Sequence, residues 1–396
     1  MESMHTFIKN MDRGFHEQAQ NWRDLESGKR VDTLRFFAHE ANKAGIVPEP
    51  KELQDHTDYW MRYLRADPKN LNHWLKVKRF AADNWALERV MEEAGVVARG
   101  PEAPSVEIAR KQFVTSTTQV IFPFFYDTNI QAGILAQPLL DRLVVETQMV
   151  TSGTADHAEM SEAAFERSTA EGGEGTVGRM VTIKARNRAI TLRKFISNAL
   201  ASYEAMRRQR IDVFARGIQR VGEAFAILLT DYALDVLING DGTTPSNAAG
   251  TTATGISGSP VYADVIALQL AFSQGYMPDM IVANGGATGS LSDLLNMVEF
   301  KDPQAGFTFQ RTGAYPTPLG MDLVRWDLTG NIDATSWSAT RILMLQTNLA
   351  LMAYTEGGLM TESQRIIDDQ WEKIVTSMWI GFGVWDSASR RVGTGW

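Results

Sequence analysis

The feature that most constrains this fold is an uninterrupted apolar periodicity in the middle of the chain. Apolar side chains recur there every three or four residues: Ile211, Phe214, Ile218, Val221, Phe225, Leu228 and Tyr232. This spacing places them on one face of a helix. It predicts a helix from about Glu204 to Ile238, roughly 50 Å long at about 1.5 Å per residue. Asn239-Gly240 caps its C-terminus, because glycine adopts positive φ without strain. We expect this helix to lie at the centre of a core.

Two oppositely charged stretches precede the predicted helix. The first, from Asp156 to Glu174, carries six carboxylates and one arginine, whereas the charges of the second, from Arg179 to Lys194, are all basic. A glycine-rich stretch, Glu171–Gly175, favours a turn where the two meet. We therefore predict a long β-hairpin with one acidic and one basic arm.

The basic arm of this hairpin has two different faces, since successive strand residues point to opposite sides. Lys184, Arg186 and Arg188 share one face, and the apolar Val181 and Ile183 share the other. A hairpin of this length cannot bury both faces by itself. We expect it to lie against another surface, with complementary charge setting its register on a partner. The candidate inter-subunit contact residues are Asp156, Glu159, Glu162, Glu166, Glu171, Glu174, Arg179, Lys184, Arg186, Arg188, Arg193 and Lys194.

A formal nucleotide-binding motif lies at the tip of the predicted hairpin. The stretch Gly173-Glu174-Gly175-Thr176-Val177-Gly178 matches GxGxxG. A dinucleotide site needs a strand before this motif and a helix after it. Here an acidic polar stretch precedes it and a strand-like stretch follows, so we interpret it as a loop tip that binds no cofactor.

Composition argues against most catalytic and metal chemistry. The chain contains no cysteine, and its six histidines all lie within the first 157 residues without HxxxH or HExxH spacing. Residues 1–100 are electrically balanced, whereas residues 101–396 hold 23 basic and 31 acidic side chains, the whole net charge of −8. Such an acidic body is a poor DNA binder, because phosphate contacts need clustered cations. We predict no catalytic residue, no metal site and no membrane span.

One alternative of a different class uses carboxylates of the long helix. Asp231 and Asp235 are one turn apart and would be close enough to pair in an α+β enzyme. The interpretation we favour is a polar stripe at a subunit contact.

The remaining segments have weaker patterns. Residues 1–100 are helical and charged, and form either a small domain with its own core or an extension that docks on other parts of an assembly. Residues 106–150, interrupted by Pro123 and Pro138, are expected to be an extended arm with strand pieces, and residues 243–258 a mobile loop. Further elements are predicted at Tyr262–Gln274 and Ser290–Met297 (helices), and at Met280–Ala283, Phe307–Gln310, Met321–Trp326, Arg341–Gln346 and within Leu359–Trp385 (strands).

The order of these blocks over about residues 110–396 resembles the major capsid proteins of tailed bacteriophages with the Hong Kong 97-type fold. Further short stretches carry the resemblance beside the hairpin and the long helix. They are the Leu192–Ser197 strand, the Leu237–Thr243 turn, the Met280–Asn284 strand followed by a capped helix, the Pro318–Met321 strand entry, and the Leu359–Val375 strand pair that leads to the Phe382–Ala388 segment.

The resemblance implies an α+β fold divided as in that family. Residues 1–104 would be an added helical N-terminal extension and 105–150 the N-terminal arm. Residues 151–196 would be the extended β-hairpin loop. The peripheral domain would hold the long spine helix at 197–244, the axial domain would span 245–358, and residues 359–396 would supply peripheral strands before returning to the axial domain.

The function that the resemblance implies is structural and not enzymatic. Copies would self-assemble as hexamers and pentamers into an icosahedral shell enclosing double-stranded DNA without sequence-specific binding, in a virion assembled in the host cytoplasm. Portal, scaffold or decoration proteins are possible further partners. An encapsulin-like nanocompartment, which shares the fold but encloses proteins, is the nearest alternative.

The sequence departs from some members of this family. Those members join subunits through a lysine–asparagine bond, but Asp369–Phe382 contains no asparagine. We therefore interpret Lys184 as a charge partner and expect noncovalent shell contacts. Some members also remove an N-terminal scaffolding segment, whereas we expect residues 1–104 to remain attached.

Overall fold

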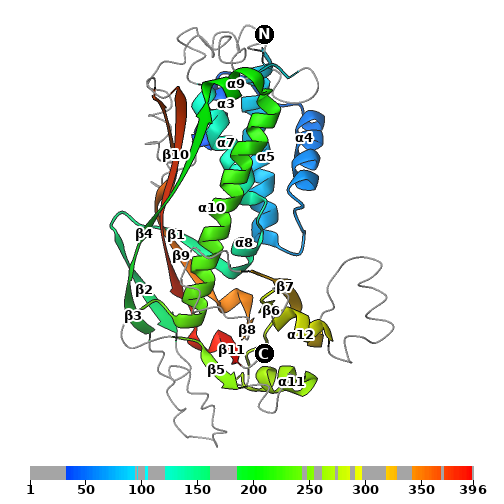
Figure 1. Cartoon of the computed structure of the whole chain (residues 1–396), viewed down its shortest axis with the longest axis vertical. Coiled ribbons are helices and arrows are strands. Elements are labelled where there is room, and N and C mark those ends of the chain that lie inside the picture. Colours follow the sequence, from blue (N-terminus) through cyan, green and yellow to red (C-terminus); the bar gives the residue numbers. More distant parts are fainter. Residues whose placement is uncertain are drawn as a thin grey trace, which may run out of the picture. The chain divides into compact units, whose positions relative to one another are not determined.

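The computed structural model of the chain consists of helices and mainly antiparallel strands (Figure 1), so the predicted α+β class is confirmed. It describes residues 33–93, 96, 103–105, 121–160, 185–242, 248–253, 261–272, 275–285, 290–296, 318–327, 341–366 and 370–394. The chain divides into two compact units. The first comprises Met1–Arg142, Arg193–Ile227 and Thr355–Ile380, and the second comprises Leu143–Leu192, Leu228–Tyr354 and Gly381–Trp396.

The first unit is rich in helices. They are α3 (Thr33–Lys43), α4 (Pro50–Tyr63), α5 (Leu71–Glu93), α7 (Ile121–Leu135), α8 (Leu139–Leu143), α9 (Tyr203–Arg208) and the first part of α10 (Ile211–Asn239). Two glycines let α7 and α10 pack with their backbones in close contact. A Cβ atom added at Gly133 would lie 2.0 Å from the carbonyl oxygen of Gln219, and one at Gly222 would lie 2.3 Å from that of Ile130.

The N-terminal helices share their core with other segments of the first unit. Phe37 of α3 packs against Phe124 of α7 with ring centroids 5.1 Å apart, and Trp60 of α4 meets Phe80 of α5 at 4.9 Å. The same cluster of buried side chains includes Ile211 and other residues of α10. The described part of residues 1–100 therefore does not form a core of its own, which corrects one of the two interpretations of this segment.

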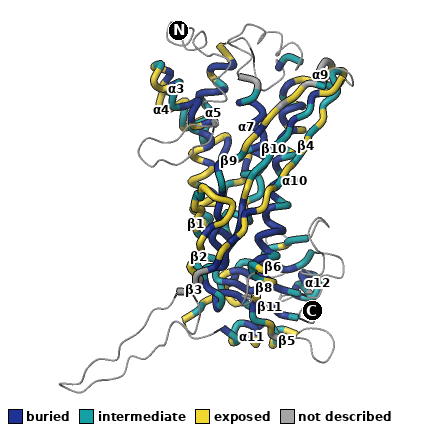
Figure 2. Tube along the Cα trace, turned by 90° about the vertical axis from the view of Figure 1, so that its left-hand side faces the viewer, coloured by how far each residue is buried: buried dark blue, intermediate teal, exposed yellow. Residues whose placement is uncertain are grey.

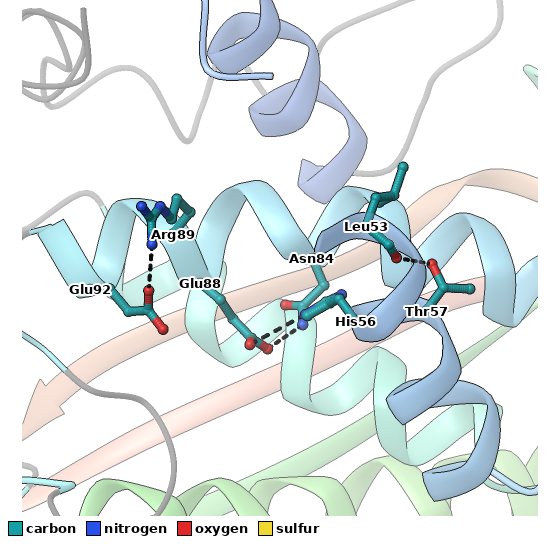
Figure 3. A network of polar contacts seen from close by, with 7 residues as sticks. All are labelled: Leu53, His56, Thr57, Asn84, Glu88, Arg89 and Glu92. Atoms are coloured by element: carbon teal, nitrogen blue, oxygen red, sulfur yellow. Dashed lines mark hydrogen bonds and ion pairs between the residues drawn. The ribbon is translucent and has the colours of Figure 1, made fainter. Parts of the chain in front are cut away.

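Polar contacts also tie α4 to α5 (Figure 3). The Nε2 atom of His56 lies 3.3 Å from Oε2 of Glu88, and the amide of Asn84 donates to the other carboxylate oxygen of Glu88. Farther along α5, Arg89 and Glu92 form an exposed ion pair one turn apart. Glu88 thus holds a histidine of one helix and an amide of its own helix together.

The prediction of an extended arm over residues 106–150 is wrong for residues 121–143. Helices α7 and α8 lie there, and strand β1 (Val144–Met149) begins only afterwards. Pro123 is in the first turn of α7 and Pro138 directly precedes α8. A proline in a first helical turn removes no helical hydrogen bond, so both prolines mark helix starts instead of interrupting strands.

The long helix is confirmed, with one difference at its start. The segment predicted as continuous from Glu204 is broken, since α9 ends at Arg208 and α10 begins at Ile211. Arg210 forms an isolated β-bridge with Ser105, and the Ile211 amide donates to the Pro104 carbonyl. These contacts with a distant segment occupy backbone groups that a continuous helix would need. The predicted cap is also present, because Gly240 has a φ of 84°.

A four-stranded sheet has the order β1-β9-β10-β4, with β9 at Leu351–Ile366, β10 at Trp371–Val384 and β4 at Arg193–Ser202. Strands β10 and β4 are antiparallel, from Trp371 opposite Ser202 to Ile380 opposite Arg193. In the first unit, Tyr126 of α7 donates a 3.0 Å hydrogen bond to the buried Glu372 of β10. The long strands predicted within Leu359–Trp385 are therefore confirmed.

The second unit contains a five-stranded sheet of order β5-β11-β8-β6-β7. Its strands are β5 (Gly250–Ala253), β11 (Arg390–Thr394), β8 (Arg341–Leu345), β6 (Met280–Ala283) and β7 (Asp322–Arg325). Helices α11 (Tyr262–Leu270) and α12 (Ser290–Asn296) pack on it through buried apolar side chains. Strands β6 and β8 are buried almost throughout (Figure 2).

The loop expected over residues 243–258 contains strand β5, whose residues pair in parallel with β11. Pairing of its backbone with a neighbouring strand thus overrides a composition rich in small polar residues. The strand expected at Phe307–Gln310 lies outside the described residues.

Candidate assembly interface

The charged hairpin is present in the described residues as strands β2 (Thr154–Met160) and β3 (Ala185–Thr191) of the second unit. The strands are antiparallel, with Thr154 opposite Thr191 and Met160 opposite Ala185. This register places Glu159 of the acidic arm opposite Arg186 of the basic arm. The base of the hairpin thus has the pairing of an acidic with a basic arm that the sequence predicted.

The predicted contact residues divide into several groups. Asp156, Arg193 and Lys194 are exposed, the last two at the start of β4. Arg188 is buried. The backbones of Glu159 and Arg186 belong to β2 and β3. The remaining candidates lie outside the described residues: Glu162, Glu166, Glu171, Glu174, Arg179 and Lys184.

Arg188 forms a buried ion pair at the base of the hairpin. Its Nη1 atom donates to Oδ1 of Asp241 at 2.8 Å, and each side chain is only 2% exposed. Asp241 lies in the turn after α10 between Gly240 and Gly242, whose φ angles of 84° and 79° suit glycine. Burial of two charges is tolerated because each neutralises the other. The structure therefore gives Arg188 a partner inside its own subunit.

His157 lies directly opposite Arg188 in the hairpin and is also buried. Its Nε2 and Nδ1 atoms are 2.7 Å from the Val384 carbonyl oxygen and the Tyr354 hydroxyl, respectively. A carbonyl can only accept, so in the neutral imidazole Nε2 donates and Nδ1 accepts from Tyr354. Gly383 leaves room for the ring, because a Cβ atom there would lie 2.9 Å from it.

The environment of Tyr354 favours its role as a donor. Burial raises the pKa of its hydroxyl above the ordinary value, and the carboxylate of Glu146 raises it further. Both effects keep the hydroxyl protonated. The Tyr354 hydroxyl therefore remains able to donate to Nδ1 of His157.

A second buried cation holds the end of α10 in the second unit. Arg390, with no exposed surface, donates through Nε to the carbonyl oxygen of Leu237. Asp386 accepts hydrogen bonds from the Ala388 amide at 2.9 Å and from the Tyr276 hydroxyl at 2.8 Å. The last turn of α10, just before the turn that carries Asp241, is thus held by Arg390 of strand β11.

The two carboxylates of the enzyme alternative have separate partners. Asp231 is buried and accepts a 2.6 Å hydrogen bond from the indole of Trp326. Asp235 accepts one at 2.7 Å from the amide of Asn239, one turn later in the helix. These partners give each carboxylate a role in holding the fold.

Sequence reasoning missed the residues that anchor the hairpin, namely His157, Asp241 and Tyr354, and it also missed the buried Arg390 at the end of α10. One weak signal was present, because Asp241 stands between two glycines at a helix end. In the described part of the chain, no cluster of three or more histidine, aspartate or glutamate side chains could hold a metal ion. None of the helices described is long and apolar enough to cross a membrane.

A family model described as Phage capsid protein matches residues 185–390, which is more than half of the 396-residue chain. The chain belongs to the phage capsid protein family. This confirms the capsid assignment drawn from the resemblance to tailed-phage major capsid proteins. The matched region begins in β3 and ends at Arg390, so it includes the basic strand of the hairpin, all of α10 and both long strands.

Several solved structures resemble this capsid protein. The capsid of a native GTA particle has a TM-score of 0.44 at 14% identity, covering 64% of this chain and 89% of that chain. The mature capsid of bacteriophage PhiM1 has a TM-score of 0.42 at 13% identity, covering 64% and 86%. The holo-SrpI encapsulin complex from Synechococcus elongatus has a TM-score of 0.38 at 13% identity, covering 65% and 86%. No curated protein matches the sequence.

Proposed function

We propose that this phage capsid protein is the major capsid protein of a tailed bacteriophage and forms a Hong Kong 97-type shell. Copies associate as hexamers and pentamers and close into an icosahedral particle around the double-stranded DNA genome. The protein acts in the virion as a wall and carries out no reaction. Assembly takes place in the host cytoplasm, with portal, scaffold or decoration proteins as further partners.

The observation that carries this proposal is the family match across residues 185–390. The hairpin gives it a physical basis. Its base is fixed by the Arg188–Asp241 pair, and its two arms have opposite charge along the sequence. A fixed base with charged arms can reach a neighbour and find its register there by charge complementarity.

The structure changes which hairpin residues we assign to the contact with a neighbour. Arg188 is an anchor within the subunit, so it is no longer among the residues that we expect to reach a partner. The exposed Asp156, Arg193 and Lys194 remain in the proposal. The other candidates of the two arms also remain in it, on the basis of their charge alone.

We divide the chain among the parts of the shell subunit as follows. Residues 1–104 are a permanent helical extension, and residues 105–150 are the N-terminal arm, which includes α7 and α8. Residues 151–196 are the extended loop, 197–244 contain the spine helix of the peripheral domain, and 245–358 form the axial domain. Residues 359–396 supply the peripheral strands and return to the axial domain.

Electron microscopy and sedimentation of the expressed chain test this function. We expect capsomers or closed shells of megadalton mass, and DNA-filled particles when the chain is produced together with its packaging partners. A chain that remains monomeric under every condition, with partners and crowding agents present, would contradict the proposal. Particles filled with a cargo enzyme would instead establish the encapsulin-like alternative.

A further inference from the structure

A cavity in the first compact unit lies between four helices. Side chains of α4, α5, α7 and α10 line it, and its volume is about 190 Å³. We call it the four-helix cavity. A water molecule needs only about 10–15 Å³ of cavity volume, so there is room for a small organic molecule. Helices α4 and α5 lie outside residues 185–390, which the family model matches, and membership in the capsid family therefore does not account for this cavity.

One wall of the four-helix cavity is aromatic. Tyr59, Trp60 and Tyr63 of α4 line it. The rings of Tyr59 and Tyr63 are stacked with centroids 5.9 Å apart, and the Trp60 ring meets each of them edge to face. Tyr59 is 43% exposed and Tyr63 45%, so a molecule from solvent can reach both rings. The faces of such rings attract cations.

A second wall, on α5, offers a buried hydrogen-bond acceptor. Asn84 lines the cavity and is only 1% exposed, and its Nδ2 atom donates to the carboxylate of Glu88 (Figure 3). This contact identifies the other amide atom of Asn84, Oδ1, as an acceptor. Within the described chain no hydrogen bond reaches this Oδ1 atom. A buried acceptor without a partner costs free energy, and a donor inside the cavity would remove that cost.

The charges along the cavity favour a cation. Glu88 of α5 and Asp212 of α10 bring two carboxylates to its lining. Arg216 brings one cation to the lining that the structure describes, but it is exposed, so salt and water screen its charge. Asp212 is already paired with Arg210 at 2.7 Å. Glu88 contacts the Asn84 amide and His56, neither of which carries a permanent charge, so Glu88 is the carboxylate that faces a bound cation.

We propose that the four-helix cavity binds an aliphatic amine in its ammonium form. The N–H groups of the ammonium donate to Oδ1 of Asn84 and to the carboxylate of Glu88. Its charge and its alkyl chain lie against the rings of Tyr59 and Tyr63 and the apolar side chain of Leu87. The bound amine joins α4 to α5 and so stabilises the packing of these two helices. This site goes beyond the proposed shell function and does not depend on it.

Titration calorimetry of the full-length chain tests the ligand class, near neutral pH and at about 150 mM salt, where exposed charges are screened. Putrescine and butylamine should each bind saturably, one molecule per chain, with a Kd below about 1 mM. Butanol lacks the charge, butyrate reverses it and tetramethylammonium lacks N–H donors, so each should bind at least about tenfold more weakly. Absence of saturable amine binding would overturn the proposal. Butyrate binding as tightly as butylamine would also overturn it, because the site would then serve anions through Arg216.

Two pairs of variants locate the bound amine. Glu88→Gln and Glu92→Gln each remove one carboxylate from α5, but of the two only Glu88 lines the cavity. Glu88→Gln should weaken putrescine binding by about tenfold or more, whereas Glu92→Gln should leave it unchanged. Equal effects of both variants would overturn the site, because the amine would then bind the acidic surface without specificity.

The second pair changes the exposed Tyr59 and stays informative even if Glu88→Gln fails to fold. Tyr59→Leu should weaken putrescine binding about two- to fivefold, the scale of an exposed cation–π contact. Tyr59→Phe keeps the ring and should bind as the wild-type protein does. Equal affinities of Tyr59→Leu and Tyr59→Phe would overturn the aromatic part of the site. Either failure would leave the shell function untouched.

Discussion

The buried ion pair at the base of the hairpin makes a quantitative prediction. Arg188→Met keeps much of the apolar stem but leaves the carboxylate of Asp241, 2% exposed, without this cation. Removing one partner of a buried pair costs about 3–5 kcal/mol. A domain is typically stable by only about 5–15 kcal/mol, so the variant should unfold at a much lower urea concentration.

Two further variants separate the pair from other effects of Arg188. Arg188→Met combined with Asp241→Leu should recover most of the lost stability, because an apolar pair of similar volume is often as stable as a buried ion pair. Arg188→Lys keeps the charge but loses the planar fork of donors, and should lie between the wild-type protein and Arg188→Met. Urea unfolding of the unassembled subunit, followed by circular dichroism and extrapolated to water, measures all three variants.

The loss of stability in Arg188→Met has a magnitude that separates a buried ion pair from an exposed one. A loss below about 1 kcal/mol for Arg188→Met would mean that the pair behaves like an exposed salt bridge. A double variant as unstable as Arg188→Met alone would mean that the unpaired carboxylate of Asp241 is not the cause of the lost stability. Either result would refute the assignment of Arg188 as an anchor.

Three other predictions concern the hairpin. Lys184→Glu combined with Arg186→Glu should abolish the particles seen in electron micrographs, while the circular dichroism spectrum of the subunit stays unchanged. Normal assembly of this variant would exclude a subunit contact through the basic arm. Gly383→Ala forces a methyl group against His157 and should destabilise the subunit by about 1–3 kcal/mol in urea titrations; an unchanged midpoint would show that the ring moves freely. Tyr354→Phe should cost about 1–2 kcal/mol near neutral pH, because it leaves a buried nitrogen of His157 without its donor. The pKa of the Tyr354 hydroxyl is raised in the folded state. The stability that this side chain contributes is therefore complete below its ordinary pKa near 10 and is lost as the pH rises above that value. An equal pH dependence of the unfolding free energy in Tyr354→Phe and in the wild-type protein would contradict this.

The long helix was predictable because its signal is local. Periodic apolar residues and the Asn239-Gly240 cap define α10 without reference to other segments. Its start was not predictable, since the break before Ile211 depends on contacts with Ser105 and Pro104, about a hundred positions earlier. Residues 121–143 were misassigned for a different reason, because a proline marks a helix start as readily as a strand interruption.

The hairpin shows where sequence reasoning ends. Alternation indicated that Arg186 and Arg188 share a face opposite the apolar Val181 and Ile183, but the local pattern contains no signal that Arg188 itself is buried. That burial is determined by Asp241, which is 53 positions from Arg188, and by Val384, which is 227 positions from His157. Charge pattern alone therefore predicted the pairing of the arms and missed the residues that hold them.

The cross-strand position of His157 opposite Arg188 has a consequence for the accuracy of assembly. A strand that slips by one residue turns every side chain to the other face. A slip of β3 would place Ala189 inward and expel Arg188, leaving Asp241 buried without this partner. A subunit whose β2 and β3 strands pair in the wrong register is therefore less stable at the base of the hairpin. This loss of stability acts against wrongly paired subunits before they bind a neighbour.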